Sequence, residues 1–561
     1  MFKRILSLAL VLGVLAIAFG SAAPGRAQAG ESPAADAPVV ARVADIHAGS
    51  GSSQTQQLIS YEGALYFQAN GYDGAGAELW KYDPTGGAQR VEDIYPGSGS
   101  SNPFDLTVYN DHLYFRADGN DGAGGELWRY DPTNGAQRAA DIYSGSGESH
   151  PSDMAVYNGF LYFQADGNNG KGAELWRYDE ILGAELVKDI YSGSEDSNPS
   201  DLTVYNGLLY FAADGNDGKG WELWKYNSTT NSAQRVADIY PGSAGSGIAD
   251  LAVYNNALYF RANGNDGKGL ELWKYDPTNG ARRAYDIYPG SYGGWPSYLT
   301  VYNGALYFAA TGDGAGNELW KYNSATNSIQ RAADIWAGAS GSTPDNLAVY
   351  GGALYFSANG NDGYGTELWQ YDSTATTNFR SSGAYDGWTL ESSETSNVGG
   401  VKNSSATTFI VGDDAHDKQY RSVLSFNTAS IPNNAVITRV MLKIRYQGAI
   451  GTNPFATHSA LVVDIRKGAF GSNDLQASDF QAAANDNAIG AIPNLPVSNW
   501  YSKTWTDSIF IYINKAGLTQ FRLRFQTDDN NNNIADYLKF FSGDSADTAV
   551  HPLLQVKYYV P

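Results

Sequence analysis

The sequence predicts an all-β protein: a seven-bladed β-propeller followed by a β-sandwich of jelly-roll type. Three observations predict this fold. The tripeptide Glu-Leu-Trp occurs seven times, with 47 to 49 residues between successive tryptophans. Each interval holds four short stretches in which apolar or aromatic residues alternate with polar ones, as in β-strands. The composition, with 39 Tyr, 22 Phe, 13 Trp and 64 Gly, is typical of strands and tight turns.

The first element is a predicted secretory signal peptide at residues 1–29. Lys3 and Arg4 precede an apolar run over 5–19, and Ala27-Gln28-Ala29 supplies the small residues of a cleavage site. The alternative is an uncleaved membrane anchor, for which the apolar run is short. We therefore expect a secreted or cell-surface protein that has no membrane span after cleavage.

Each repeat then supplies four strands of one blade. In the second copy the expected strands are Leu106–Tyr109, Leu113–Ala117, Glu126–Tyr130 and Gln137–Ile142. Asn-Gly and similar dipeptides between the first two strands favour tight hairpin turns. The connections after the first and third strands are short, whereas those after the second and fourth are long and lie together on the opposite face of the propeller.

The repeats also predict how the ring closes. An Asp-Ile pair ends the fourth strand, and its first copy, Asp45-Ile46, precedes every other predicted strand. No such strand follows the last Glu-Leu-Trp, at 367–369. The segment Val40–Ile46 should therefore be the outer strand of the seventh blade, which removes a free sheet edge. The propeller is predicted to span residues 39–375.

The repeat resembles a known family. Leu-Tyr-Phe-x-Ala, a glycine-rich turn, Glu-Leu-Trp-Lys-Tyr-Asp and a closing Asp-Ile are similar to the bacterial ELWxxDGTxxGT repeat proteins, although Asp-Pro-Thr-Asn-Gly stands where that family shows Asp-Gly-Thr. The resemblance covers about 340 residues and implies a secreted propeller. It implies an extracellular location without a defined activity.

A Ser/Thr-rich linker is predicted at 376–383, followed by a sandwich over 384–561. Its expected strands are Thr408–Val411, Arg421–Phe426, Ala435–Tyr446, Ala460–Arg466, Ser508–Ile513, Gln520–Phe525 and Leu553–Tyr559. The segments 420–426, 431–437, 541–544 and 552–556 resemble the DNRLRE, or disaggregatase-related, domain of bacterial and archaeal surface proteins. Some of its relatives are carbohydrate-binding modules, so the resemblance implies an accessory domain for glycan binding or surface display.

The long-loop face holds the candidate ligand-binding residues. The connection after each fourth strand begins with an aromatic side chain, and an aromatic face can stack on a sugar ring while nearby polar groups bind hydroxyls. The alternative is that each aromatic packs against the next blade and helps to close the ring. The predicted ligand-binding residues are His47, Tyr95, Tyr143, Tyr191, Tyr240, Tyr288 and Trp336.

Calcium is the candidate cofactor. The Gly-Asn-Asp-Gly loop after each second strand carries oxygen side chains that can surround Ca²⁺, although Asn-Asp-Gly is also an ordinary turn sequence. The candidate metal ligands are Asp118, Asn120, Asp121, Glu126, Asp214, Asn216, Asp217 and Glu222. Three further groups of aspartates could each either bind a cation or cap the backbone amides of turns. They are Asp105, Asp153, Asp201 and Asp250 near the channel mouth; Asp413, Asp414 and Asp417; and Asp528, Asp529 and Asp536.

Composition and motifs narrow the function. The net charge of −22 argues against nucleic acid as a partner, and the lack of cysteine excludes disulfides and thiolate chemistry. The six histidines lie in no catalytic motif, and most acids of the propeller recur in every blade, so no catalytic residue is assigned. We expect a non-catalytic binding or adhesion protein whose partner is an extracellular glycan or surface protein. The alternatives are an extracellular polysaccharide-acting enzyme and a structural surface or matrix component. The sequence leaves the oligomeric state open.

Overall fold

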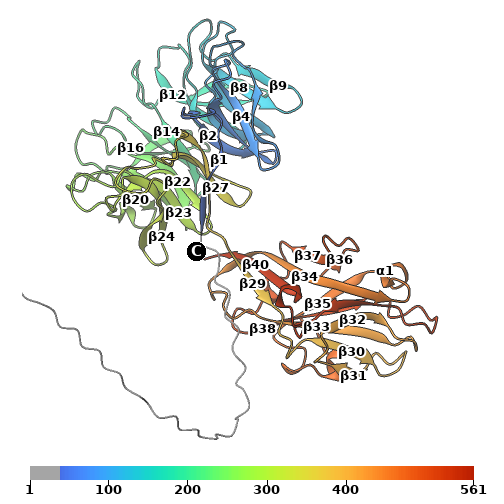
Figure 1. Cartoon of the computed structure of the whole chain (residues 1–561). Coiled ribbons are helices and arrows are strands. Elements are labelled where there is room, and N and C mark those ends of the chain that lie inside the picture. The colour runs from blue at the N-terminus through green and yellow to red at the C-terminus, as the bar shows by residue number, and fades with distance from the viewer. Residues whose placement is uncertain (1–37, 561) are drawn as a thin grey trace, which may run out of the picture.

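The computed structural model describes residues 38–560, which form two β-domains (Figure 1). The predicted signal peptide lies outside the described residues. Helix is limited within them to α1 (Pro454–Thr457) and the short 3-10 turns Ala477–Phe480, Phe510–Tyr512 and Thr548–Val550. None of the helices in this part of the chain has the length and apolar character needed to span a bilayer.

The first domain is the predicted seven-bladed propeller. Every blade is a four-stranded antiparallel sheet. Blades 1 to 3 are β2 (Gln56–Tyr61), β3 (Ala64–Asn70), β4 (Ala77–Asp83), β5 (Gly87–Glu92); β6 (Phe104–Tyr109), β7 (His112–Ala117), β8 (Glu126–Asp131), β9 (Gly135–Ala140); and β10 (Ser152–Tyr157), β11 (Phe160–Asp166), β12 (Ala173–Asp179), β13 (Gly183–Lys188). Blades 4 to 6 are β14 (Ser200–Tyr205), β15 (Leu208–Ala213), β16 (Glu222–Asn227), β17 (Ser232–Ala237); β18 (Ala249–Tyr254), β19 (Ala257–Ala262), β20 (Glu271–Asp276), β21 (Gly280–Tyr285); and β22 (Ser297–Tyr302), β23 (Ala305–Thr311), β24 (Asn317–Asn323), β25 (Ser328–Ala333).

The seventh blade confirms the predicted closure. It consists of β26 (Asp345–Tyr350), β27 (Ala353–Asn359), β28 (Thr366–Asp372) and, from the other end of the chain, β1 (Val39–Ala44). β1 pairs antiparallel with β28, from Val39 opposite Asp372 to Ala44 opposite Leu368. The N-terminal strand therefore completes the last blade, and no blade is left with three strands.

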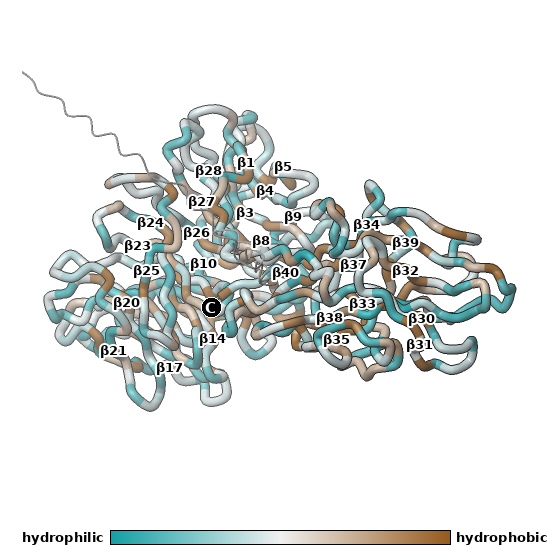
Figure 2. Tube along the Cα trace, turned by 60° about the horizontal axis from the view of Figure 1, so that its bottom comes forward, coloured by the Kyte–Doolittle hydropathy of each residue, from teal (hydrophilic) through white to brown (hydrophobic). Residues whose placement is uncertain are grey.

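The blades are held together by apolar layers between them. Seven hydrophobic clusters each join two consecutive blades, including one that joins the seventh blade to the first. The last residue of each innermost strand is a tyrosine whose hydroxyl donates to a carbonyl in the first turn of the next blade, as from Tyr61 to Asp111 at 2.8 Å. The same bond recurs at all seven junctions and ends with Tyr350 donating to Gly63. In Figure 2 hydrophobic positions follow the strands and hydrophilic ones the rim loops.

The second domain is a curled twelve-stranded sheet whose layers enclose one hydrophobic core. β34 bends between the layers: its first part pairs with β40 and β37, and its end pairs with β39. The strands are β29 (Ala375–Arg380), β30 (Gly387–Glu391), β31 (Gly399–Asn403), β32 (Thr408–Asp413), β33 (Gln419–Asn427), β34 (Val436–Ile450), β35 (Leu461–Lys467), β36 (Ala491–Ile492), β37 (Trp500–Trp505), β38 (Leu518–Phe525), β39 (Tyr537–Phe541) and β40 (Leu553–Tyr559).

Two sequence-based expectations for this domain are wrong. The expected linker at 376–383 instead forms most of β29, which pairs with β40 and buries Phe379 in the core. The expected strand Ser508–Ile513 is a 3-10 turn, because Ile509 and Ile513 both reach the core from its two ends. Only two residues, Ser373 and Thr374, separate β28 from β29, and Lys557 of β40 lies 2.9 Å from Asp372 of β28.

Candidate functional site

The channel mouth on the long-loop face is built from one residue per blade. Each innermost strand has a register shift near its start, and its second residue adopts a left-handed φ between 54° and 60°. Asn and Asp tolerate this region better than other side chains that carry a Cβ. We define the channel mouth by these seven residues: Gln57, Asp105, Asp153, Asp201, Asp250, Tyr298 and Asn346.

A relay of hydrogen bonds connects these residues from blade to blade. The backbone N–H of each one donates to the side chain of the preceding one, with N–O distances between 2.6 and 3.2 Å. The relay runs from Gln57 through the four aspartates to the N–H of Tyr298. The four aspartates therefore cap backbone amides, as one of the two readings of the sequence expects.

Burial also changes the acidity of these carboxyl groups. Burial, followed by the charge of Asp250, raises the pKa of Asp201 to about 8, and burial raises the pKa of Asp105 to about 7. The pKa of Asp250 is also raised by burial, although Arg261, whose guanidinium lies 3.3 Å from its carboxylate, opposes the shift. Burial thus raises the pKa of all four aspartates of the channel mouth.

The relay of hydrogen bonds ends at Tyr298, and a cavity lies next to this residue at the channel mouth. Within residues 38–560 no equivalent bond joins Tyr298 to Asn346 or Asn346 to Gln57. A cavity of about 250 Å³ lies here, lined by the polar side chains of Gln57, Asp201, Asp250, Tyr298 and Asn346 and by leucines of five innermost strands. Its walls therefore combine apolar surface with several hydrogen-bonding groups.

A larger cavity, of about 520 Å³, lies on the opposite, short-turn face. It is lined by turns of blades 4 and 5, among them Asn255 and Asp276. Its polar groups already have partners: Asn255 donates to Ser324, and Arg282 pairs with Asp276 at 2.7 Å. The polar groups of the channel mouth also have protein partners, so the channel mouth is distinguished by the leucines of five innermost strands, which add apolar wall to its polar lining.

The seven predicted ligand-binding aromatics are all half-buried at the start of the outer loops. The rings of His47, Tyr95 and Tyr143 lie against the glycine four residues further along their own loop, where an added Cβ would come within 2.2 Å of a ring atom. The structure thus gives these rings a packing contact within the loop, and His47 also stacks on Tyr72 of the next blade, with ring centroids 4.4 Å apart. A role in ligand binding remains a prediction for all seven.

The residues predicted to bind calcium are engaged in protein hydrogen bonds. Glu126 is fully buried and accepts from the N–H groups of Ile142, Tyr143 and Ser149 and from the Ser149 hydroxyl. Glu222 accepts from Ile239 and Tyr240 in the same way. The loop side chains Asp118, Asp121, Asp214 and Asp217 each accept from an N–H two residues ahead, whereas Asn120 and Asn216 occupy left-handed positions.

These contacts favour the ordinary-turn reading of the loop. In the described part of the chain no three Asp, Glu or His side chains lie close enough to share a metal ion. The donor set therefore does not fit a carboxylate-rich Ca²⁺ site, and calcium binding remains a prediction.

Comparison of the seven blades reveals functional candidates that the repeat analysis did not single out. The loop 288–298 carries Tyr292, Trp295 and Tyr298, which are 80 %, 53 % and 38 % exposed. The signal was present in the sequence, because no other outer loop has aromatic residues at these three positions. Sequence alone did not tell whether these side chains were exposed or packed.

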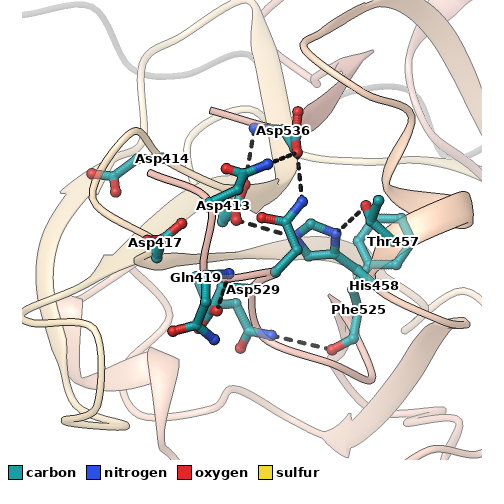
Figure 3. A network of polar contacts seen from close by, with 12 residues as sticks. Asp413, Asp414, Asp417, Gln419, Thr457, His458, Phe525, Asp529 and Asp536 are labelled. Carbon is teal, nitrogen blue, oxygen red and sulfur yellow. Dashed lines mark hydrogen bonds and ion pairs between the residues drawn. The ribbon is translucent and has the colours of Figure 1, made fainter. Parts of the chain in front are cut away.

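In the second domain the two expected acidic clusters join into one network (Figure 3). Asp413 and His458 are both fully buried, 3.3 Å apart, and Asp413 also accepts from the N–H of Asp536. Asp417 accepts from the N–H of Asn533, and Asp536 accepts from three N–H groups of neighbouring loops. The network therefore ties the ends of β32 and β34 to the Asn-rich loop before β39. Two tryptophans of this domain could in principle stack on a sugar, but Trp505 is buried in the core and Trp500 is half-buried.

No protein-family model and no curated protein matches this chain. Similar solved structures include an extracellular domain from B. thetaiotaomicron (BT4673), with 11% identity, a TM-score of 0.41 and coverage of 70% of this chain and 57% of that one. Puromycin hydrolase is 12% identical, with a TM-score of 0.42 and coverage of 71% and 62%. An oligogalacturonate lyase in complex with manganese is 14% identical, with a TM-score of 0.38 and coverage of 59% and 92%.

The chain thus spans less than two thirds of the length of the first two of these structures. At these identities and scores the similarities carry no inference about function.

Proposed function

We propose that this protein is a non-catalytic binding protein for an extracellular glycan, and that the long-loop face of the propeller is its main contact surface. The observation that carries the proposal is the channel mouth, where a cavity of about 250 Å³ presents amide, carboxyl and phenol groups beside leucines. Pockets that bind small polar ligands combine apolar walls with a few placed polar groups in this way. The predicted secretion of the chain gives it access to such ligands.

The second domain supports the same role as an accessory. Its resemblance to glycan-binding surface domains makes it a second candidate contact. Only two residues separate β28 from β29, and the Lys557–Asp372 ion pair also links the two domains. β28 ends on the short-turn face, so the second domain is attached opposite the channel mouth, and a second weak site there raises the affinity for a polymer long enough to reach both.

A glycan array probed with the mature chain, with and without Ca²⁺, tests the proposal. We expect binding to at least one glycan class, and a double change of Asp201→Asn and Asp250→Asn to weaken it while the amide-capping oxygens remain. The double change Tyr143→Ala, Tyr191→Ala tests the predicted aromatic ring separately. Loss of signal in EDTA would support the calcium prediction. Binding of no glycan by the parent protein would refute the proposal.

A polysaccharide-acting enzyme is the second candidate. The observation that favours it is the raised pKa of Asp201, about 8, next to Asp250, since a protonated carboxyl beside another carboxyl is the arrangement glycosidases use. Against it, both carboxylates accept backbone N–H groups in the relay. Incubation with a polysaccharide panel distinguishes the two, because the enzyme releases shorter products and the binding protein does not.

A further inference from the structure

The outer loop between blades 5 and 6, residues 288–298, departs from its six counterparts. We call it the aromatic loop. Where it has Tyr292, the other loops have Gly51, Gly99, Gly147, Glu195, Ala244 and Ser340; where it has Trp295, they have Gln54, Asn102, His150, Asn198, Gly247 and Thr343. Its third aromatic, Tyr298, replaces an amide or carboxyl side chain at the channel mouth. The other blades thus act as an internal reference for what the fold alone requires.

The aromatic loop gives up stabilising features that most other loops keep. Trp295 and Tyr298 adopt left-handed φ values of 52° and 58°, a region in which bulky side chains are unfavourable. Gly294 stands where the six other loops have serine, so Glu271 accepts from a backbone N–H there but from no hydroxyl. Of the seven outer loops, this one combines strained positions with exposed Tyr and Trp side chains, which points to a function of that copy.

The exposed rings are nevertheless held in place. The indole N–H of Trp295 donates to the carbonyl of Tyr292 at 2.9 Å, and the backbone N–H of Trp295 donates to Leu270 at 3.1 Å. The N–H of Tyr298 is fixed by Asp250 in the relay. The side chains of Tyr292 and Trp295 are therefore exposed on a backbone that is hydrogen-bonded to the neighbouring loop. Binding a ligand would then cost little conformational entropy of this loop.

We propose that Tyr292, Trp295 and Tyr298 form a stacking platform for a neutral pyranose chain, one end of which reaches the channel cavity. This inference rests on the proposed function and names its ligand class. A pyranose ring has an apolar face of C–H groups and a rim of hydroxyls. The platform supplies aromatic faces, and the adjoining cavity supplies Gln57, Asn346 and Asp201 for hydroxyls.

The negative charge of the protein favours neutral sugars over acidic ones as ligands. The whole chain has a net charge of −22. A uronic acid polymer would bring carboxylates to an acidic surface, which like-charge repulsion opposes.

The test compares two consensus substitutions in the mature full-length chain. Trp295→Asn puts at this position the residue that stands at Asn102 and Asn198, so the variant should fold at least as well as the parent. Tyr72→Asn is the matched control: Tyr72 is 77 % exposed, has a left-handed φ of 56°, and corresponds to Asn120 of the next blade. Calorimetry with neutral hexasaccharides of glucose, mannose and xylose and with hexagalacturonate measures affinity.

We expect the parent to bind a neutral hexasaccharide, Trp295→Asn to lose at least tenfold in affinity, and Tyr72→Asn to stay within twofold. If the parent binds a glycan and Trp295→Asn retains the affinity, the platform is wrong while the proposed function stands. A preference for hexagalacturonate overturns the neutral ligand class. If the parent binds no sugar, both the platform and the proposed function fail. If Trp295→Asn abolishes self-association and leaves the sugar affinity unchanged, the platform alone fails.

Discussion

The glutamate of each Glu-Leu-Trp tripeptide organises its blade at the scale of single residues. Glu126 accepts four hydrogen bonds from one outer loop, and the glutamates of the other blades accept the equivalent N–H groups. The tryptophan of the same tripeptide covers the glycine after the second strand, as Trp128 covers Gly119. The repeated tripeptide thus fixes both long loops of a blade, which explains its regular recurrence without a ligand.

Glu126→Gln tests this role. Glutamine has one acceptor oxygen, so its amide N–H₂ would face backbone donors that lose their partner in a buried site. We expect the free energy of unfolding to fall by about 1–3 kcal/mol. Urea denaturation measures the change. Glu148→Gln, in the same outer loop but half-exposed, should change stability by less than about 0.5 kcal/mol; equal effects of the two changes would contradict the anchoring role.

Two of the left-handed aromatic positions, Tyr72 and Trp295, predict a gain in stability on substitution. Asparagine adopts a left-handed φ at smaller cost than tryptophan or tyrosine, so Trp295→Asn and Tyr72→Asn should each raise the free energy of unfolding by about 1 kcal/mol. Tyr72 also loses its stacking on His47, whose ring centroid lies 4.4 Å away, so its gain should be the smaller one. Thermal melting of both variants measures this, and a loss of stability in Trp295→Asn would show that its φ is not strained.

At the scale of elements, the sequence repeat predicts the strands that recur in every blade. It does not predict strands whose partners lie far away in the sequence. The seven blades, and β1 as the outer strand of the seventh, follow from counting Asp-Ile against Glu-Leu-Trp. β29 could not be foreseen, because Ala-Thr-Thr-Asn-Phe-Arg reads as a polar linker until β40, at 553–559, supplies its partner. The positions of the channel-mouth aspartates were predictable from the repeat, but their relay was not, because it depends on a left-handed backbone.

Ring closure by β1 gives a prediction at this scale. Removing residues up to 46 would expose the edge of β28 and take Val40 and Ile46 from the two clusters that flank the seventh blade. We expect the chain starting at 47 to melt at least about 10 °C below the chain starting at 38, since several apolar side chains and one ladder are lost. Differential scanning calorimetry checks this. Superimposable melting curves of the two chains would show that β1 does not hold the ring.

At the scale of the whole molecule, the two faces of the propeller differ in their symmetry. On the short-turn face the tyrosine hydroxyl bonds close through all seven blades. On the long-loop face the carboxylate relay covers five junctions and stops at Tyr298, next to the aromatic loop. A uniform ring therefore carries one local irregularity, and this irregularity coincides with the cavity and the exposed aromatics. Within the long-loop face, the aromatic loop and the adjoining cavity are therefore where we expect the sugar chain to bind.

The buried acids make the stability of the whole protein depend on pH. Burial raises the pKa of Glu174, Glu222 and Glu271 to about 7, and that of Asp201 and Asp386 to about 8. Their pKa values in the unfolded chain are near 4, so between pH 4.5 and 8 the folded state binds more protons than the unfolded state. The free energy of unfolding should therefore increase as pH falls from 8 to 5.

Melting temperatures at constant ionic strength over this range test the prediction. Carboxyl groups with a lowered pKa oppose it, but only at lower pH. Arg282 lowers the pKa of Asp276 to about 2, so the contribution of this group is lost below about pH 4, outside the window. Asp201→Asn should remove part of the slope, because the amide cannot ionise, and should stabilise the protein at pH 8 more than at pH 5. A melting temperature that falls on acidification from pH 8 to 5 would mean that these carboxyl groups are ionised and well solvated in the folded protein.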